Sequence, residues 1–146
     1  MPVAGIDHAA IPTTQPEAML RFYRALGFAA PSPEEWLEKR MRSFSLVCGN
    51  NKINVHAPGL WLDPGFTLRG PTAQPGCGDF CFVWEGTVED LQATLKAAGA
   101  VTEVGPVERI GGRAGGSTRG MSIYTRDPDR NLIEFIVYPD APAAHS

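Results

Sequence analysis

Residues 127–134 read Asp127-Pro128-Asp129-Arg130-Asn131-Leu132-Ile133-Glu134. The first five are turn formers, and an apolar strand is expected to follow them over residues 132–138. Because side chains alternate between the two faces of a strand, Glu134 shares its face with Leu132 and Ile136. An unpaired carboxylate in such surroundings costs several kcal/mol. Glu134 is therefore predicted to be paired, protonated or bound to a metal ion.

A second strand with clean alternation occurs in the first half of the chain, over residues 52–56. It puts Asn54 and His56 on one face and two apolar side chains on the other. The preceding residues 40–48 are expected to form its antiparallel neighbour. His56 is a candidate ligand at a position that resembles that of Glu134, although a solvated histidine would also be ordinary at a strand end.

The two halves of the chain share one order of landmarks. A strand followed by a helix that stops at a glycine is expected at residues 5–27 and again at residues 79–99. Thr13 or Thr14 is expected to cap the first helix, and Thr87 the second. A repeated supersecondary unit usually shares one core, so the pattern predicts two related modules.

The remaining segments are expected to be irregular. Residues 58–78 contain five glycines and four prolines and are interpreted as the connection between the halves. Its apolar residues are expected to pack over another part of the chain, namely Trp61, Leu62, Phe66 and Leu68. Residues 29–35 and 105–120 are expected to be loops. Short strands are expected at 101–104 and 121–125, and a polar tail from residue 139.

Composition narrows the class of protein. The chain has 146 residues, 43% of them apolar and 20% charged, which is typical of one soluble globular domain. A net charge of −3 without a basic cluster argues against a nucleic-acid partner. No apolar run is long enough for a membrane span. Three cysteines and the absence of a signal-peptide pattern predict a reducing, cytoplasmic location.

Four candidate ligands recur at similar places in the two halves. His8 and Asp79 lie on the opening strands, and His56 and Glu134 lie on the closing strands. Two imidazoles and one carboxylate are the ligand set that suits Fe(II) and other divalent first-row metals, here Fe, Mn, Ni, Co or Zn. Asp79 is expected to add an oxygen ligand or to orient a histidine. Each of the four also has a purely structural interpretation as a strand residue.

Other polar residues are weaker candidates. Tyr124 could donate a hydrogen bond in a pocket, but core packing explains a strand tyrosine equally well. Arg113, Arg119 and Arg126 could hold an anionic substrate, although a surface arginine is usually only solvated. No catalytic residue is assigned beyond Tyr124.

Four stretches together carry a family resemblance that spans residues 5–138, namely 6–8 (Ile-Asp-His), 22–28 (Phe-Tyr-Arg-Ala-Leu-Gly-Phe), 52–56 (Lys-Ile-Asn-Val-His) and 122–134 (Ser to Glu). The chain resembles the glyoxalase / bleomycin-resistance / ring-cleavage dioxygenase superfamily, also called vicinal oxygen chelate proteins. It is most similar to small glyoxalase-domain proteins of unassigned activity.

The resemblance implies an α+β fold of two βαβββ modules, whose curved mixed sheets surround a metal pocket. In one domain over residues 1–146, it implies a first module at about 5–57, a connection at 58–78 and a second module at 79–138. It also implies a homodimer and places ligands at His8, His56, Asp79 and Glu134.

The expected function is a metal-dependent lyase, isomerase or oxygenase acting on a small molecule with vicinal oxygens. Asp79 and His56 stand where many relatives have His and Glu, respectively, which argues against methylglyoxal-type isomerisation. The alternative is a metal-free protein that binds and sequesters a small molecule, in the manner of the bleomycin-resistance members.

Overall fold

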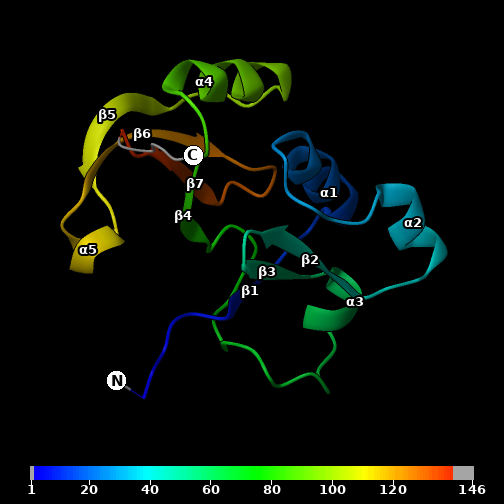
Figure 1. Cartoon of the computed structure of the whole chain (residues 1–146). Helices are drawn as coiled ribbons and strands as arrows, with labels where there is room; N and C mark the ends of the chain where they lie inside the picture. Colours follow the sequence, from blue (N-terminus) through cyan, green and yellow to red (C-terminus); the bar gives the residue numbers. More distant parts are fainter. Residues whose placement is uncertain (1, 140–146) are drawn as a thin grey trace. The chain divides into compact units, whose positions relative to one another are not determined.

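The computed structural model describes residues 2–139, and within them the chain forms two compact units (Figure 1). Unit 1 contains the residues up to Gly78 together with Pro128–Arg130, and unit 2 contains Asp79–Asp127 and the residues from Asn131 onward. The expected tail from residue 140, with its His145, lies outside the described residues. No described helix is long and apolar enough to cross a membrane.

Unit 1 is a three-stranded sheet with helices. Its elements are β1 (His8–Pro12), α1 (Pro16–Ala25), α2 (Pro33–Glu38), β2 (Ser43–Cys48), β3 (Asn51–His56) and α3 (Pro58–Trp61). The strand order is β1-β3-β2, in which β1 runs parallel and β2 antiparallel to β3. A single bridge between Ala29 and Val47 is the only further pairing described for this sheet.

The two faces of the unit 1 sheet differ in burial. One face carries Ile11, Phe44, Leu46 and Val55, all nearly inaccessible to solvent. The residues of α1 that point inward, including Met19, Leu20 and Tyr23, are equally buried. The opposite face carries polar side chains that are half-buried or exposed. The alternation read in the sequence therefore separates a core face from an open face.

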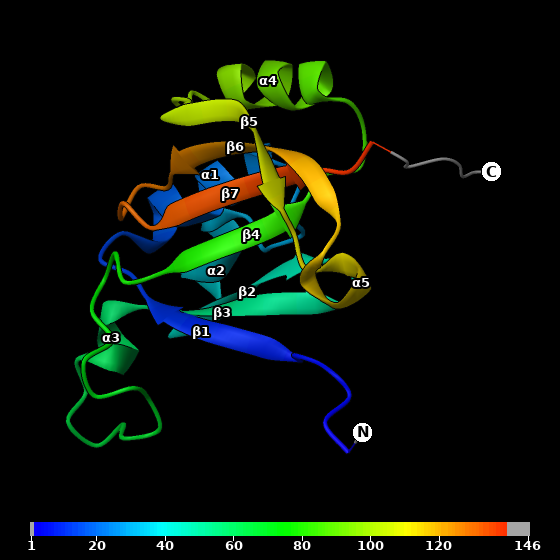
Figure 2. The ribbon, with the colours of Figure 1, turned by 90° about the vertical axis from the view of Figure 1, so that its left-hand side faces the viewer.

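Unit 2 has the complete strand, helix and three-strand order. Its elements are β4 (Asp79–Val83), α4 (Val88–Ala97), β5 (Val104–Ile110), α5 (Arg113–Gly116), β6 (Arg119–Arg126) and β7 (Leu132–Val137). The strand order is β4-β7-β6-β5, with only the β4–β7 pair parallel. Figure 2 shows these strands side by side with α4 along one side of the sheet.

The core of unit 2 lies between α4 and one face of its sheet. Leu91 and Leu95 of α4 are buried, as are Ile123, Ile133 and Phe135 of the strands. As predicted, Thr87 begins α4, and its side chain accepts from the backbone N–H of Asp90 at 3.0 Å in a capping box. The predicted α+β architecture is thus confirmed in both units.

Three segments expected to be irregular contain structure. Helix α2 begins inside the expected loop at 29–35, because Ser32 caps it and Pro33 suits its first turn. Helix α3 occupies the start of the connection. The strand expected at 101–104 begins only at Val104 and continues as β5 through the first six residues of the loop expected at 105–120. Gly105 and Pro106 interrupt its pattern, and the register shifts between Val104 and Val107.

The prediction that Thr13 or Thr14 caps α1 is wrong. The N-cap residue is Gln15, whose side chain makes no capping bond. The hydroxyl groups of Thr13 and Thr14 instead donate to the two carboxylate oxygens of Asp129, the latter at 2.6 Å. The backbone N–H of Thr14 donates to the same carboxylate at 3.3 Å. A residue from the turn before β7 therefore satisfies the polar groups at the start of α1.

Candidate metal-binding and substrate-binding residues

Glu134 lies half-buried in the middle of β7, on the open face of the unit 2 sheet. Its carboxylate accepts a hydrogen bond from the Ser122 hydroxyl at 2.6 Å. Tyr124 on β6 stands directly opposite it, and Cys81 is its partner on β4. The carboxylate is thus oriented by a buried hydroxyl while the face around it stays partly open, as a metal-binding carboxylate requires.

The pKa of the Cys81 thiol depends in part on the charge of Glu134. Burial of the thiol, followed by the charge of Glu134 and a hydrogen bond to it, raises the pKa of Cys81 to about 12. Cys81 is therefore a protonated thiol at neutral pH, and a poor metal ligand in that form.

Asp79 begins β4 on the same face as Glu134 and is exposed. The register pairs it with Leu132, two residues before Glu134. The strand spacing and rise place the two Cα atoms about 8 Å apart. Two carboxylate side chains at that separation can both reach one divalent ion, to which they would offer oxygen ligands.

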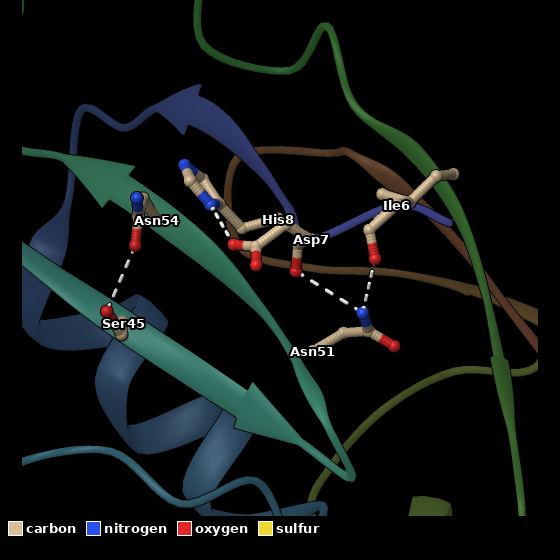
Figure 3. A network of polar contacts seen from close by, with 6 residues as sticks. All are labelled: Ile6, Asp7, His8, Ser45, Asn51 and Asn54. Carbon is tan, nitrogen blue, oxygen red and sulfur yellow. Dashed lines mark hydrogen bonds and ion pairs between the residues drawn. The ribbon is translucent and has the colours of Figure 1, made fainter. Parts of the chain in front are cut away.

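His8 begins β1 in unit 1, and 45% of its side chain is exposed. Its Nδ1 donates to Asp7 at 2.7 Å, because a carboxylate can only accept (Figure 3). That bond leaves Nε2 as the basic nitrogen, the arrangement found in many metal-binding histidines. The His8 hydrogen bond also lowers the pKa of the Asp7 carboxyl.

His56 lies at the other end of the same sheet. The register pairs His8 with Lys52 but pairs His56 with Pro12, four residues further along β1. At the usual rise this is about 13 Å, so one ion cannot take a nitrogen from each histidine. The predicted two-histidine set is therefore not assembled within unit 1.

The surroundings of His56 are aromatic and cationic. Its ring meets Phe66 edge to face at 5.3 Å, and burial followed by the charge of Arg69 lowers its pKa. Arg69 lies over the ring of Trp61 at 5.7 Å. The Trp61 indole donates to the carbonyl oxygen of Thr13 at 2.9 Å. Trp61 and Phe66 of the connection thus pack over unit 1 as expected, whereas Leu62 and Leu68 are exposed, contrary to the prediction.

The register also changes which residues correspond in the two units. His8 and Asp79 both begin their strands, paired with Lys52 and Leu132. The counterpart of Glu134, two residues later, is therefore Asn54 and not His56. Asn54 accepts from the Ser45 hydroxyl at 3.0 Å, as Figure 3 shows. Sequence landmarks could not detect this shift, because they do not fix which residues pair across strands.

No three His, Cys, Asp or Glu side chains between residues 2 and 139 gather so that they could hold a metal ion. Tyr124 is half-buried, and its hydroxyl oxygen accepts from Nε of Arg109 at 3.1 Å. Arg119 pairs with Glu108 at 3.2 Å. Arg126 on β6 likewise has a carboxylate partner. Sequence reasoning missed Arg109, which no motif distinguishes.

Comparison with known proteins identifies two relatives that match over nearly the whole of this chain. The chain is 34% identical over 139 residues to the glyoxalase domain-containing protein RDO1 of Mycosarcoma maydis, covering 95% of this chain and 71% of that protein. It is 34% identical over 134 residues to the virulence protein STM3117 of Salmonella typhimurium, covering 91% and 83%.

Solved structures agree with the sequence matches. The crystal structure of STM3117 has a TM-score of 0.75 at 33% identity and covers 94% of this chain and 99% of that one. The structure of an integron cassette protein from the mobile metagenome of V. cholerae also has a TM-score of 0.75, at 29% identity, and covers 94% of this chain and 98% of that one. A family profile matches residues 5–135. The chain therefore belongs to the Glyoxalase/Bleomycin resistance protein/Dioxygenase superfamily.

Proposed function

We propose that this protein is a metal-dependent lyase, isomerase or oxygenase that acts on a small molecule with vicinal oxygens. The observation that carries the proposal is Glu134, a half-buried carboxylate oriented by Ser122 on an otherwise apolar strand. Membership of a superfamily that often uses divalent metals supports it. When bound, such an ion would supply Lewis acidity toward the oxygens of the substrate.

The ligands proposed in unit 2 are Glu134 and Asp79, and the ligand proposed in unit 1 is His8. Asp79 shares the open face of Glu134, and His8 has Nε2 available because Nδ1 is bonded to Asp7. His56 is the alternative nitrogen ligand, disfavoured because the neighbouring Arg69 would repel a cation. Tyr124 is proposed to donate its hydroxyl hydrogen to the substrate, because its oxygen already accepts from Arg109.

Metal content of the full-length protein, purified without chelators, tests the proposal. We expect about one equivalent of Fe, Mn, Ni, Co or Zn, and its loss in Glu134→Gln and His8→Ala. The isosteric Gln removes the charge but keeps the shape of the side chain. Asn54→Ala is the matched control, because Asn54 occupies the counterpart of the Glu134 position.

Two results would contradict this proposal. Wild-type metal content in both Glu134→Gln and His8→Ala would show that any ion sits elsewhere. A wild-type protein that is metal-free and does not take up added Fe(II), Mn(II), Ni(II), Co(II) or Zn(II) would leave no role for a metal. Loss of metal in His56→Ala with retention in His8→Ala would reassign the nitrogen ligand to His56.

The second candidate is metal-free binding of a small planar molecule. It is favoured by the half-buried cluster of His56, Trp61, Phe66 and Arg69, which offers aromatic faces and a guanidinium group. Such surfaces stack on planar ligands. Ligand-induced thermal shifts that persist with chelator, and disappear in Phe66→Ala, would favour it over the metal-dependent enzyme.

We also propose that the protein acts as a homodimer in the cytoplasm. Pairing is supported by membership of a superfamily whose members often form dimers. Three free cysteines among the described residues suit a reducing compartment. Sedimentation equilibrium of the purified chain gives the oligomeric state, and a monomer at micromolar concentration would contradict the dimer.

A further inference from the structure

The four arginines of unit 2 differ in what holds them. Arg119 and Arg126 form ion pairs with Glu108 and Glu103 at 3.2 and 3.0 Å. Arg109 and Arg113 have no carboxylate partner within residues 2–139 and instead lie over tyrosine rings. Two guanidinium charges in this unit are thus positioned by neutral groups.

Arg109 is fixed at three points. Its guanidinium lies 5.6 Å from the centre of the Tyr124 ring, and its Nε donates to the Tyr124 hydroxyl at 3.1 Å. Its Nη1 donates to the carbonyl oxygen of Glu108 at 3.0 Å. These bonds leave the Nη2 hydrogens free to donate to another acceptor. A pre-positioned guanidinium loses little entropy when it binds an oxyanion.

Arg113 is fixed by the turn at the end of β5. Its guanidinium lies 4.0 Å from the centre of the Tyr138 ring. Gly111 makes this approach possible, because a Cβ atom there would lie 1.9 Å from the Tyr138 hydroxyl. The N–H of Gly111 donates to the carbonyl of Thr118 at 2.8 Å, which closes the turn. The packing therefore requires glycine and holds Arg113 against the sheet.

Both tyrosines lie on the face that carries Glu134. Tyr124 stands directly opposite Glu134 on the neighbouring strand. Tyr138 lies four residues after Glu134, and because side chains alternate along extended chain it points to the same face. Arg109 pairs with Gly120, which also lies on that face. The two arginines therefore border the open surface around the proposed metal-binding carboxylate.

We infer that Arg109, positioned by Tyr124, and Arg113, positioned by Tyr138, bind an oxyanion group of the substrate beside Glu134. The inference rests on the proposed function for its link to a substrate. It names the class as small acids that carry a carboxylate or phosphoryl group next to their vicinal oxygens. Planar guanidinium groups match both oxyanions, because each presents paired oxygens to the N–H donors.

The test follows Arg Nε–H and backbone N–H signals of the full-length protein by NMR during titration with acetate, and separately with inorganic phosphate. Acetamide, of similar shape but neutral, is the control ligand. The titrations use protein freed of metal by chelator, so no anion can bind through an ion. We expect saturable shifts at Arg109, Arg113 and Tyr124 with one or both anions and none with acetamide. A preference for acetate or phosphate identifies the oxyanion.

Variants make the assignment specific. Arg109→Gln is expected to weaken anion binding at least about tenfold, Arg109→Lys less, and Tyr124→Phe less again. Arg119→Gln is the matched control, an exposed arginine that already has a carboxylate partner, and is expected to bind as the wild type does.

Non-saturating shifts, equal shifts with acetamide, or equal weakening in Arg109→Gln and Arg119→Gln would overturn the inference. Metal content measured on the same variants distinguishes a failure of the anion-binding inference from a failure of the proposed metal site. Arg109→Gln should keep its metal content while losing the anion, and Glu134→Gln should do the reverse.

Discussion

The open faces of the two sheets share one arrangement of a serine hydroxyl and its acceptor, but the acceptors differ in charge. In unit 1, Asn54 accepts from the Ser45 hydroxyl at 3.0 Å. In unit 2 the corresponding residue is Glu134, which accepts from Ser122 at 2.6 Å. A neutral amide and a carboxylate thus occupy equivalent positions in two related sheets.

The difference indicates how a repeated scaffold can become asymmetric in function. The core faces of both units are apolar and close-packed, because each must support its sheet. The open faces are under no such requirement, so a single change from amide to carboxylate concentrates negative charge in unit 2. Unit 1 contributes aromatic and cationic groups from its connection instead. Four predictions test this difference between the two units.

The largest effect concerns how the first helix of each unit begins. Asp129→Ala is expected to lower the free energy of unfolding by about 3 kcal/mol, because it leaves the donors of Thr13 and Thr14 without their charged acceptor. Thr87→Ala removes only the local cap of α4 and is expected to cost about 1 kcal/mol. Urea unfolding of both variants measures the difference. Equal costs would show that the distant Asp129 acts no more strongly than a local cap.

The second prediction uses the alkylation rate of Cys81 to test the charge of the neighbouring Glu134. With its pKa at about 12, the Cys81 thiol should stay protonated and react slowly with iodoacetamide at pH 8. Glu134→Gln removes the negative charge, lowers the pKa of Cys81 and is expected to speed its alkylation about tenfold.

Cys48 of unit 1 is the control for that experiment. Burial alone raises the pKa of its thiol, so its alkylation rate should not change in Glu134→Gln. Mass spectrometry of alkylated peptides follows both sites in one sample. An unchanged rate at Cys81 would mean that Glu134 does not carry its charge beside the thiol.

A smaller effect compares the two serines. Ser122→Ala is expected to reduce the metal affinity of the protein about tenfold, because the Glu134 carboxylate loses the hydroxyl that orients it. Ser45→Ala removes the matching hydroxyl from Asn54 and should leave metal affinity unchanged. Competition with a coloured chelator gives both affinities, and equal losses would break the proposed asymmetry.

The smallest effect is the titration of His56. Burial and then Arg69 lower its pKa, so NMR titration should give a value below the ordinary 6.5. Arg69→Gln should move that value upward. Because the folded-state pKa lies below the unfolded one, the contribution of His56 to stability is present above about pH 6.5 and declines as the pH falls. A pKa unaffected by Arg69→Gln would remove Arg69 from the surroundings of His56.

The local features of this protein can be predicted from its amino-acid sequence alone. Alternation defined the core and open faces of β3 and β7, and glycine stops located the ends of both main helices. Thr87 was identifiable as a cap because a capping box is read within four residues. Glu134 stood out because its neighbours along one strand are apolar. The family resemblance, now confirmed, rests on the same local motifs.

Which residues lie in contact depends on the tertiary structure and could not be predicted from local patterns. Register assigned Asn54, in place of His56, to the counterpart of Glu134, because pairing across strands depends on neighbours distant in sequence. The start of α1 is satisfied by Asp129, 115 residues beyond Thr14. Arg109 is a candidate site residue only because Tyr124 on the adjacent strand positions its guanidinium group. Each depends on chain segments brought together by folding, which no local pattern records.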